Sequence, residues 1–302
     1  MKSPARLASA AYFKVIDLLP DSLKWRLART SLVTFYRRLT PWLGRGLGDG
    51  LHRIDSGPLA GYWINLESGA ARGYPSIRQY QKGSYEPLVA AVIDRYCRPG
   101  AVVCDIGAHL GYFSLLMAQR IGRNGLCLAF EPNQANYARL MQTVAANRLD
   151  NLRVVPAAVA AQSGPIRFAV HANSLMGHLH DPADNGAAPG EVLHYDTVSA
   201  VSLDDYWSEN SFPALTFIKI DVEGAEETVL QGAEGLLRAQ RPVLLIEVHH
   251  SADSHHAPRL GQWLASLGYH LFTLADQPIP PADLTPGHVL ALPAQEASPP
   301  TL

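Results

Sequence analysis

An acid, a glycine loop and a second acid stand in this chain where an α/β sheet would hold a cofactor. Asp105 lies in the apolar run 102–106 and is followed by Gly107, and a second apolar run, 126–130, ends at Glu131. A glycine after a first strand lets the backbone approach a ligand closely, and an acid that ends the second strand accepts hydrogen bonds from ribose hydroxyls. These residues predict a site for a ribose-containing cofactor.

The spacing within the loop distinguishes between cofactors. A dinucleotide fingerprint reads Gly-x-Gly-x-x-Gly, and its helix N-terminus takes a pyrophosphate. Here the pattern is Asp105-x-Gly107-x-x-x-Gly111, so that an acid replaces the first glycine. A carboxylate in the loop would repel a pyrophosphate, but it suits the amino and sulfonium cations of S-adenosylmethionine. We therefore expect S-adenosylmethionine as the cofactor, with an NAD-dependent oxidoreductase as the alternative.

Four further side chains stand at the ends of two later apolar runs. Asp221 ends one predicted strand and Glu223 follows it, and Glu247 and His249 end the next. Residues two apart on a strand share a face, so Glu247 and His249 can converge on Asp221 at the carboxyl edge of a parallel sheet. We expect these four residues to line the acceptor site and to supply a general base. Glu226, beside Asp221 and Glu223, could share these roles. The simpler interpretation is an acid-rich helix start beside an ordinary strand end.

Metal binding is a second possibility at this edge. Asp221, Glu247 and His249 together offer oxygen and nitrogen ligands that would suit a divalent metal. The histidines that follow, His250, His255 and His256, have a spacing that fits no closed tetrahedral site, so we expect them in a solvated loop.

From residue 101 onward the apolar periodicity alternates between strand and helix. This alternation predicts βαβ units and a mainly parallel sheet with helices on both faces. We expect strands at 101–106, 126–130, 152–157, 215–221, 243–248, 269–274 and 288–292, and helices at 85–96, 111–121, 133–148, 225–239 and 258–268. Between the third and fourth strands, the insertion 158–205 is expected to hold one strand, 165–170, and a polar loop, 171–195.

The chain divides by composition into three parts. Residues 1–80 form a predicted basic helical extension with a linker, residues 81–292 a Rossmann-like domain, and residues 293–302 a flexible proline-rich tail. Residues 1–53 contain ten Lys or Arg and three acids, a charge of +7 in a chain whose net charge is −2. This segment either packs on the body as a helical cap or contacts an anionic membrane surface peripherally.

Composition narrows the class of protein. Hydrophobic residues are 47% of the chain and charged residues 17%, as in a globular enzyme. The three cysteines fit a reducing compartment, and the sequence shows neither a signal peptide nor an apolar run long enough to span a bilayer, so we expect a cytoplasmic protein. Outside residues 1–53 the charge is −9, which argues against nucleic acid as a partner.

The motifs taken together closely resemble the FkbM-type methyltransferase family. The most specific is the phrase 218–226, Ile-Lys-Ile-Asp-Val-Glu-Gly-Ala-Glu, and the segments 103–108, 130–132 and 242–249 occur in the family's order. Further matches are Ser-Leu-Asp-Asp at 202–205 and the Gly83-x-Tyr85-Glu86 motif. The resemblance covers roughly residues 80–275, about two-thirds of the chain.

This resemblance implies a class I methyltransferase with a Rossmann-like, mainly parallel seven-stranded sheet. It also implies S-adenosylmethionine-dependent O-methylation of a hydroxyl on a sugar or a polyketide-like natural product, and we favour a small-molecule or glycan acceptor of carbohydrate type. The cofactor residues are then expected to be Tyr85, Glu86, Asp105, Gly107, His109, Gly111, Glu131 and Pro132. A helix cap would explain Glu86 as well. His109 departs from the family's usual Asn, a residue that tolerates left-handed backbone better.

Two other classes compete with this prediction. A non-catalytic scaffold with a methyltransferase fold would show a decayed cofactor loop, yet only His109 departs. A nucleic-acid methyltransferase would carry a basic cleft or an Asn/Asp-Pro-Pro-aromatic motif for a flipped base, and neither is visible in the sequence.

Overall fold

The computed structural model describes residues 50–66, 75–171, 178–179, 192–251 and 253–295. The predicted basic helices before residue 50, most of the polar loop of the insertion and the end of the tail lie outside these ranges. Within the described part, no helix combines the length and the apolar character needed to cross a bilayer.

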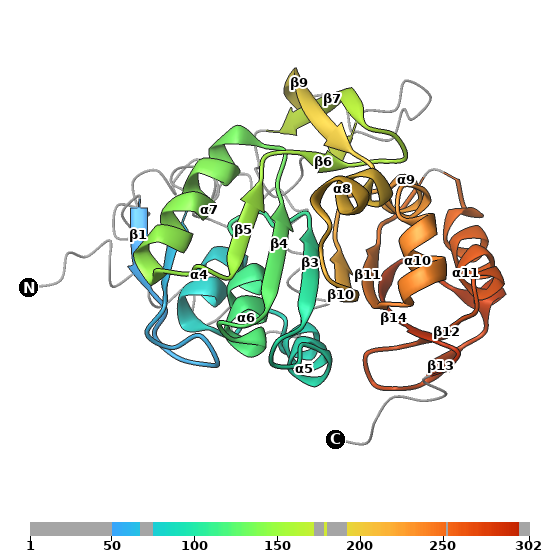
Figure 1. Cartoon of the computed structure of the whole chain (residues 1–302), viewed down its shortest axis with the longest axis horizontal. Coiled ribbons are helices and arrows are strands. Elements are labelled where there is room, and N and C mark those ends of the chain that lie inside the picture. The colour runs from blue at the N-terminus through green and yellow to red at the C-terminus, as the bar shows by residue number, and fades with distance from the viewer. Residues whose placement is uncertain (1–49, 67–74, 172–177, 180–191, 252, 296–302) are drawn as a thin grey trace, which may run out of the picture.

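A large mixed sheet forms the centre of the molecule (Figure 1). Its strand order is β13-β12-β14-β11-β10-β3-β4-β5, and the strands from β11 to β5 are parallel, while β14 runs antiparallel between β11 and β12. The strands are β3 (Val102–Ile106), β4 (Leu126–Phe130), β5 (Leu152–Val155), β10 (Leu215–Ile220), β11 (Val243–Val248), β12 (Tyr269–Phe272), β13 (Pro278–Ile279) and β14 (Gly287–Pro293). The predicted α/β fold class, a class I methyltransferase fold, is confirmed. Among the described residues the sheet has eight strands rather than seven, because the short β13 pairs with the edge of β12.

The chain order places a topological switch point between β3 and β10. The chain proceeds outward from β3 to β4 and β5, and then resumes on the other side of β3 with β10 and β11. Ligands of open α/β sheets bind at the carboxyl ends of strands at such a point. The sequence-predicted cofactor loop follows β3 and the predicted acceptor residues follow β10 and β11, so the topology brings the two groups to one edge.

Helices cover both faces of the sheet, as expected. Alternate residues of β3 show this: Val103 packs in the core with α5 and α6, whereas Cys104 packs in the opposite core with α9, α10 and α11. The helices are α5 (Pro87–Tyr96), α6 (Tyr112–Ile121), α7 (Gln134–Asn147), α8 (Leu203–Asn210), α9 (Glu226–Gln231), α10 (Glu234–Gln240) and α11 (His256–Ser266), with the 3-10 turn η3 (Pro281–Asp283). The three cysteines are buried free thiols.

One predicted helix is divided in two. The expected helix 225–239 breaks between α9 and α10 at Gly232. A β-carbon on Gly232 would lie 2.0 Å from the carbonyl oxygen of Ala160, so the backbone of the helix end approaches the insertion too closely for any side chain. Close contact with a neighbouring segment thus overrides the helical periodicity.

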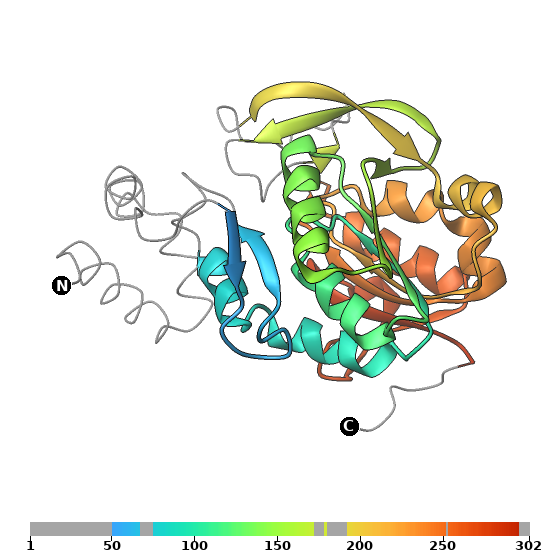
Figure 2. The ribbon, with the colours of Figure 1, turned by 60° about the vertical axis from the view of Figure 1, so that its left-hand side comes forward.

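Part of the predicted extension packs with the body. The hairpin of β1 (Gly50–Arg53) and β2 (Trp63–Leu66) lies beside α7 (Figure 2). The backbone N–H of Trp63 donates to Asn147 and that of Asn65 donates to Thr143. Ile64 belongs to the same core as β3 and α6, and a helix absent from our prediction, α4 (Pro75–Lys82), follows. The described residues 50–66, together with Tyr80 of α4, therefore share a core with the domain that was expected to begin at residue 81.

The insertion builds a second, smaller sheet instead of one strand and a loop. Its strand order is β6-β9-β7-β8, formed by β6 (Ala158–Val159), β7 (Gly164–His171), β8 (His178–Leu179) and β9 (Val192–Val201). The expected loop 171–195 is wrong at three places: β7 extends to His171, β8 occupies 178–179, and β9 has already begun over 192–195. The signal was weak because β9 is largely exposed and carries polar residues on both faces. The hairpin of β7 and β9 lies beyond the carboxyl end of the main sheet, where β5 leads into β6 (Figure 1).

Candidate active site

The glycine loop after β3 is shaped by two close approaches. Gly107 has φ 83°, and a β-carbon there would lie 1.8 Å from the carbonyl oxygen of Asp221. Gly111 has φ 85°, and its β-carbon would meet the Leu140 side chain at 2.1 Å. Both positions require glycine, the first for the junction with β10 and the second for the packing of α6 against α7. The predicted loop is therefore held tightly against the acceptor edge.

Glu131 fastens this loop to the start of α7. Its Oε2 accepts a hydrogen bond from the His109 N–H at 2.8 Å, and its Oε1 accepts from the Asn133 N–H at 2.9 Å, across the half-buried Pro132. Burial raises the pKa of Glu131 to about 7 although these amides oppose the shift. Each carboxylate oxygen has a second lone pair, so the acid retains capacity to accept from ribose hydroxyls. His109 adopts the left-handed conformation, with φ 51°, as the family's Asn would.

Asp105 presents a buried carboxylate oxygen that lacks a donor. Oδ2 accepts from the Ser114 hydroxyl at 2.5 Å, but Oδ1 has no hydrogen-bond partner within the described part of the chain. The nearest cation is the Lys219 ammonium, 3.6 Å away. Burial raises the pKa of Asp105, and Lys219 opposes that shift. An anionic oxygen without a donor fits a cationic amino group, so these residues suit S-adenosylmethionine better than a pyrophosphate.

Lys219 lies between Asp105 at the cofactor loop and Asp221 at the acceptor edge. It is 4% exposed, and its ammonium lies 3.0 Å from Asp221 Oδ2 as well as beside Asp105. The charges of Asp221 and Asp105 raise the pKa of Lys219 although burial lowers it. In turn, Lys219 holds the pKa of Asp221 below its usual value against the effect of burial. Sequence reasoning did not single out this lysine, although a lone cation inside the apolar strand β10 was a usable signal.

The predicted convergence of Asp221, Glu247 and His249 is confirmed as geometry. The Nε2 atom of His249 lies 3.9 Å from Asp221 Oδ1 and 3.9 Å from Glu247 Oε1. One ligand atom from each residue lies within 4.8 Å of the others, which is the arrangement that a divalent cation would need. Their chemical roles stay predictions.

Glu223 completes this face of the cluster. Its carboxylate lies 3.4 Å from His249 Nε2, and its backbone is left-handed, with φ 53°. A non-glycine residue in that conformation is uncommon and carries backbone strain. Burial raises the pKa of Glu223 to about 7, and the charge of His249 opposes the shift.

Glu86 lies with the acceptor residues. It occupies the N-cap position of α5 with φ 39°, and its carbonyl accepts from the Ala90 N–H, but within the described chain its side chain makes no capping hydrogen bond. Its Oε2 lies 3.6 Å from His288 Nε2, which in turn lies 3.4 Å from Glu247 Oε2. Its neighbour Tyr85 packs edge-on against Tyr80 with ring centroids 4.4 Å apart. The cofactor roles expected for Tyr85 and Glu86 stay predictions.

Three further residues belong to this cluster: the sequence analysis missed His288, misplaced His256, and named Glu226 only beside the acceptor residues. His256 was expected in a solvated loop, yet it is 7% exposed and begins α11 beside Glu226. Glu226 is fully buried against His249, 2.7 Å from its Nδ1. His288 reaches the site because β14 pairs with β11 and sets His288 opposite Glu247. That pairing depends on an antiparallel strand inserted between β11 and β12, which the sequence pattern alone does not reveal.

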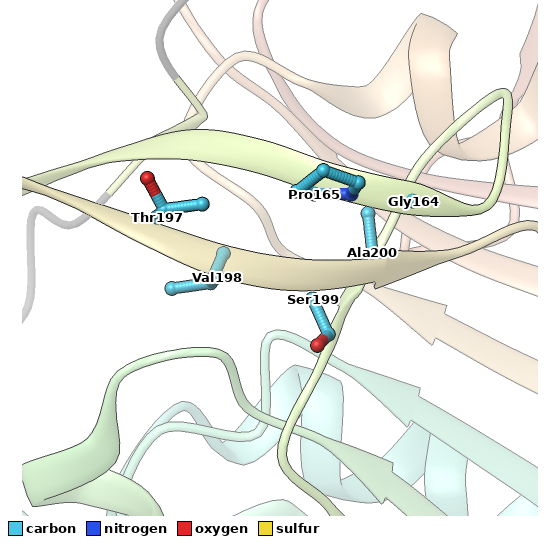
Figure 3. Close-up of a pocket in the computed structure, with 6 residues that line it drawn as sticks. All are labelled: Gly164, Pro165, Thr197, Val198, Ser199 and Ala200. Atoms are coloured by element: carbon cyan, nitrogen blue, oxygen red, sulfur yellow. The ribbon is translucent and has the colours of Figure 1, made fainter.

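A separate shallow pocket lies on the insertion. It is lined by residues of β7 and β9, namely Gly164, Pro165, Thr197, Val198, Ser199 and Ala200 (Figure 3). None of these lining residues carries an ionisable side chain. The pocket therefore contains none of the predicted site residues.

Comparison with known proteins gives consistent results. Residues 105–271 match the family described as the methyltransferase FkbM domain. The chain is 30% identical over 207 residues to 31-O-demethyl-FK506 methyltransferase FkbM of Streptomyces tacrolimicus, covering 61% of this chain and 76% of that protein. It is 25% identical over 182 residues to 2-O-methyltransferase NoeI of Sinorhizobium fredii (strain NBRC 101917 / NGR234), covering 55% of this chain and 72% of that protein.

Among solved structures, the chain is similar to methyltransferase FkbM from Methylobacillus flagellatus KT. The TM-score is 0.44 at 16% identity, over 75% of this chain and 56% of the other. The chain thus spans little more than half the length of that protein.

Proposed function

Because the chain belongs to the FkbM methyltransferase domain family and is an S-adenosylmethionine-dependent methyltransferase, we propose that it methylates a hydroxyl group of a sugar or polyketide-like acceptor at the carboxyl edge of β10 and β11. The observation that carries the proposal is the contact between the two halves of the site. The backbone N–H of Asp221 donates to the carbonyl of Ile106 at 3.0 Å, directly before Gly107. The cofactor loop and the acceptor cluster are thus adjoining strand ends.

The cofactor half is assigned to the loop and the two acids. Asp105 would face the amino group of S-adenosylmethionine, and Gly107 would let the backbone approach the cofactor closely. Glu131 would accept hydrogen bonds from the ribose hydroxyls. When bound, S-adenosylmethionine would supply the methyl group of its sulfonium: the acceptor oxygen would form a bond to the methyl carbon while the carbon–sulfur bond breaks and its electron pair stays on sulfur. The same carboxylates disfavour NAD, since its pyrophosphate would meet Asp105.

The acceptor half must remove a proton. A sugar hydroxyl is a poor nucleophile until its proton leaves, and His249 Nε2 stands among carboxylates in position to take it. Asp221, Glu223 and Glu247 surround that nitrogen at 3.4–3.9 Å and can accept hydrogen bonds from neighbouring hydroxyls of a polyol. This environment favours a hydroxyl-rich acceptor over an anionic one.

A divalent cation is the second way in which this edge could activate a hydroxyl. Asp221, Glu247 and His249 would hold it, and it would lower the pKa of a bound hydroxyl in place of a base. Activity that survives a chelator favours the base, whereas activity restored only by Mg²⁺ or Mn²⁺ favours the cation.

The names of the relatives guide the choice of acceptors. One is named for the 31-O position of a demethylated FK506 and the other for 2-O-methylation, so both act on oxygen. We propose a screen of monosaccharides, oligosaccharides and hydroxylated macrolides with methyl-labelled cofactor, read by mass spectrometry. The proposal predicts an O-methylated product with wild type and a rate reduced about 10²–10⁴-fold in His249→Gln. Label transferred to nitrogen or sulfur acceptors at rates above any hydroxyl acceptor would overturn it.

A further inference from the structure

Glu226 is the most enclosed acid at the acceptor edge. Its side chain is 0% exposed at the start of α9, and its Oε1 accepts from the Gly224 N–H at 3.0 Å and lies 2.7 Å from His249 Nδ1. Because Oε1 already accepts the amide hydrogen of Gly224, that oxygen acts as an acceptor toward the imidazole as well, and the proton of the short contact lies on His249 Nδ1.

A second histidine stands on the other side of this carboxylate. His256 Nε2 lies 3.6 Å from Glu226 Oε2, and within the described residues neither atom has a hydrogen-bond partner. The other ring nitrogen of His256 lies 3.7 Å from Glu227 at the surface. Glu226 is thus enclosed between two imidazoles, one at the acceptor edge and one at the start of α11, and a small movement would bring His256 into hydrogen-bond range.

We propose that Glu226 is the positioning residue of this site: held between His256 and His249, it fixes His249 in the tautomer that carries its proton on Nδ1 and presents the Nε2 lone pair to the acceptor. The inference rests on the proposed function, in which Nε2 takes the hydroxyl proton. That proton gives an imidazolium, whose charge the buried Glu226 stabilises until the Nε2 proton leaves to solvent. The groups that face His249 are Asp221 after β10, Glu223 in the following loop, Glu226 on α9 and Glu247 on β11.

The tautomer of His249 can be determined by NMR in the absence of a methyl-acceptor substrate. In protein labelled with ¹⁵N-histidine, the two-bond couplings and nitrogen shifts of each ring show which nitrogen carries the proton. Spectra are recorded above the pKa of about 9 that His249 has in this site, so that the ring is neutral. Signals are assigned with His249→Gln and His256→Gln. The same samples are titrated with S-adenosylmethionine by calorimetry, which reports the cofactor half alone.

Two substitutions of Glu226 distinguish the effect of its acceptor oxygen from the effect of its negative charge. Glu226→Gln keeps an oxygen for Nδ1–H but removes the charge, and Glu226→Met removes both. Glu234→Gln on the exposed face of α10 is the matched control, since that acid contacts only Arg238 among the described side chains. We expect Nδ1–H in wild type, Glu226→Gln and the control, and a change to Nε2–H in Glu226→Met. His256→Gln should broaden the Nδ1–H signal of His249 without reversing the tautomer.

The outcomes separate the two proposals. An Nε2–H tautomer in wild type, or an unchanged tautomer in a folded Glu226→Met protein, would overturn the inference about Glu226 while cofactor binding still supports the methyltransferase site. If Glu226→Met does not fold, the wild-type tautomer and Glu226→Asp, whose shorter side chain should weaken the Nδ1–H signal, decide instead. Wild type that does not bind S-adenosylmethionine would refute the proposed function independently of the tautomer.

Discussion

The carbonyl oxygen of Asp221 occupies the space into which a β-carbon on Gly107 would project, 1.8 Å from its ideal position. The end of β3 and the end of β10 therefore meet backbone to backbone. This contact ties the cofactor loop to the acceptor cluster, because neither strand end can shift without moving the other. The consequence is that a change as small as one methyl group should disturb both halves of the site.

Gly107→Ala should lose cofactor binding and stability together. Gly100→Ala is a matched control, because Gly100 has the same φ of 83° but no described atom within 4 Å of its β-carbon. The backbone strain common to both variants is about 1–3 kcal/mol. We expect Gly107→Ala to cost clearly more in the free energy of unfolding, measured by urea denaturation, and to abolish S-adenosylmethionine binding. Equal losses in the two variants would show that the strand ends are not in contact.

Lys219→Met should leave two acids without their shared cation. Asp105 is almost fully buried, and removal of one partner of a buried ion pair costs about 3–5 kcal/mol. The loss should shrink as the pH falls, since protonation of Asp105 and Asp221 removes the uncompensated charge. Urea denaturation at neutral and acidic pH checks this, with the exposed Arg238→Met as control. A loss of stability that does not depend on pH would argue that Lys219 acts through its cation–π contact with Phe113 instead.

The residues behind these two predictions differ in how readily the sequence pattern identifies them. Asp105, Gly107 and Glu131 could be predicted because each stands at the end of an apolar run or inside the following turn, and strand periodicity fixes where such ends meet. Asp221, Glu247 and His249 could be predicted to converge for the same reason. In each case local pattern and sheet topology agree, which is when sequence reasoning is most reliable.

The remaining residues depend on contacts between distant elements. His288 reaches the site only because β14 lies antiparallel beside β11. His256 appears in a polar stretch with Asp253 and His255, so its burial follows from how α11 packs and not from its neighbours in sequence. The strand β9 has too little apolar alternation to be recognised and forms because it pairs with β7, and the helix breaks at Gly232 because the carbonyl oxygen of Ala160 approaches it closely.

The rate of methyl transfer should rise with pH toward the alkaline side. Burial lowers the pKa of His249, but the hydrogen bond to Glu226 and the charge of Glu223 raise it further, to about 9. Below that value the Nε2 atom is protonated and cannot act as a base, so the rate should increase about tenfold per pH unit and level off above it. Glu226→Gln should move the inflection to lower pH. A profile that is flat through this range would exclude His249 as the base.

His249 should also contribute to the free energy of unfolding, and this contribution should fall with rising pH, whereas the rate of methyl transfer rises. A histidine whose folded pKa is raised stabilises the folded chain fully below its unfolded pKa of about 6.5 and loses that contribution as the pH passes through about 9. His249→Gln should therefore narrow the difference in unfolding free energy between neutral and alkaline pH. An unchanged difference in the variant would show that the ion pairs around His249 are too weak to matter.

The most direct test of the account is calorimetric titration of S-adenosylmethionine and S-adenosylhomocysteine into wild type and Glu131→Ala, with NAD as the control ligand. Glu131 is suited to it because its two oxygens already hold the loop and the start of α7. The account predicts binding of both sulfur ligands to wild type, loss of that binding in the folded variant, and no binding of NAD. Binding of NAD, or a folded wild type that binds neither sulfur ligand, would contradict it.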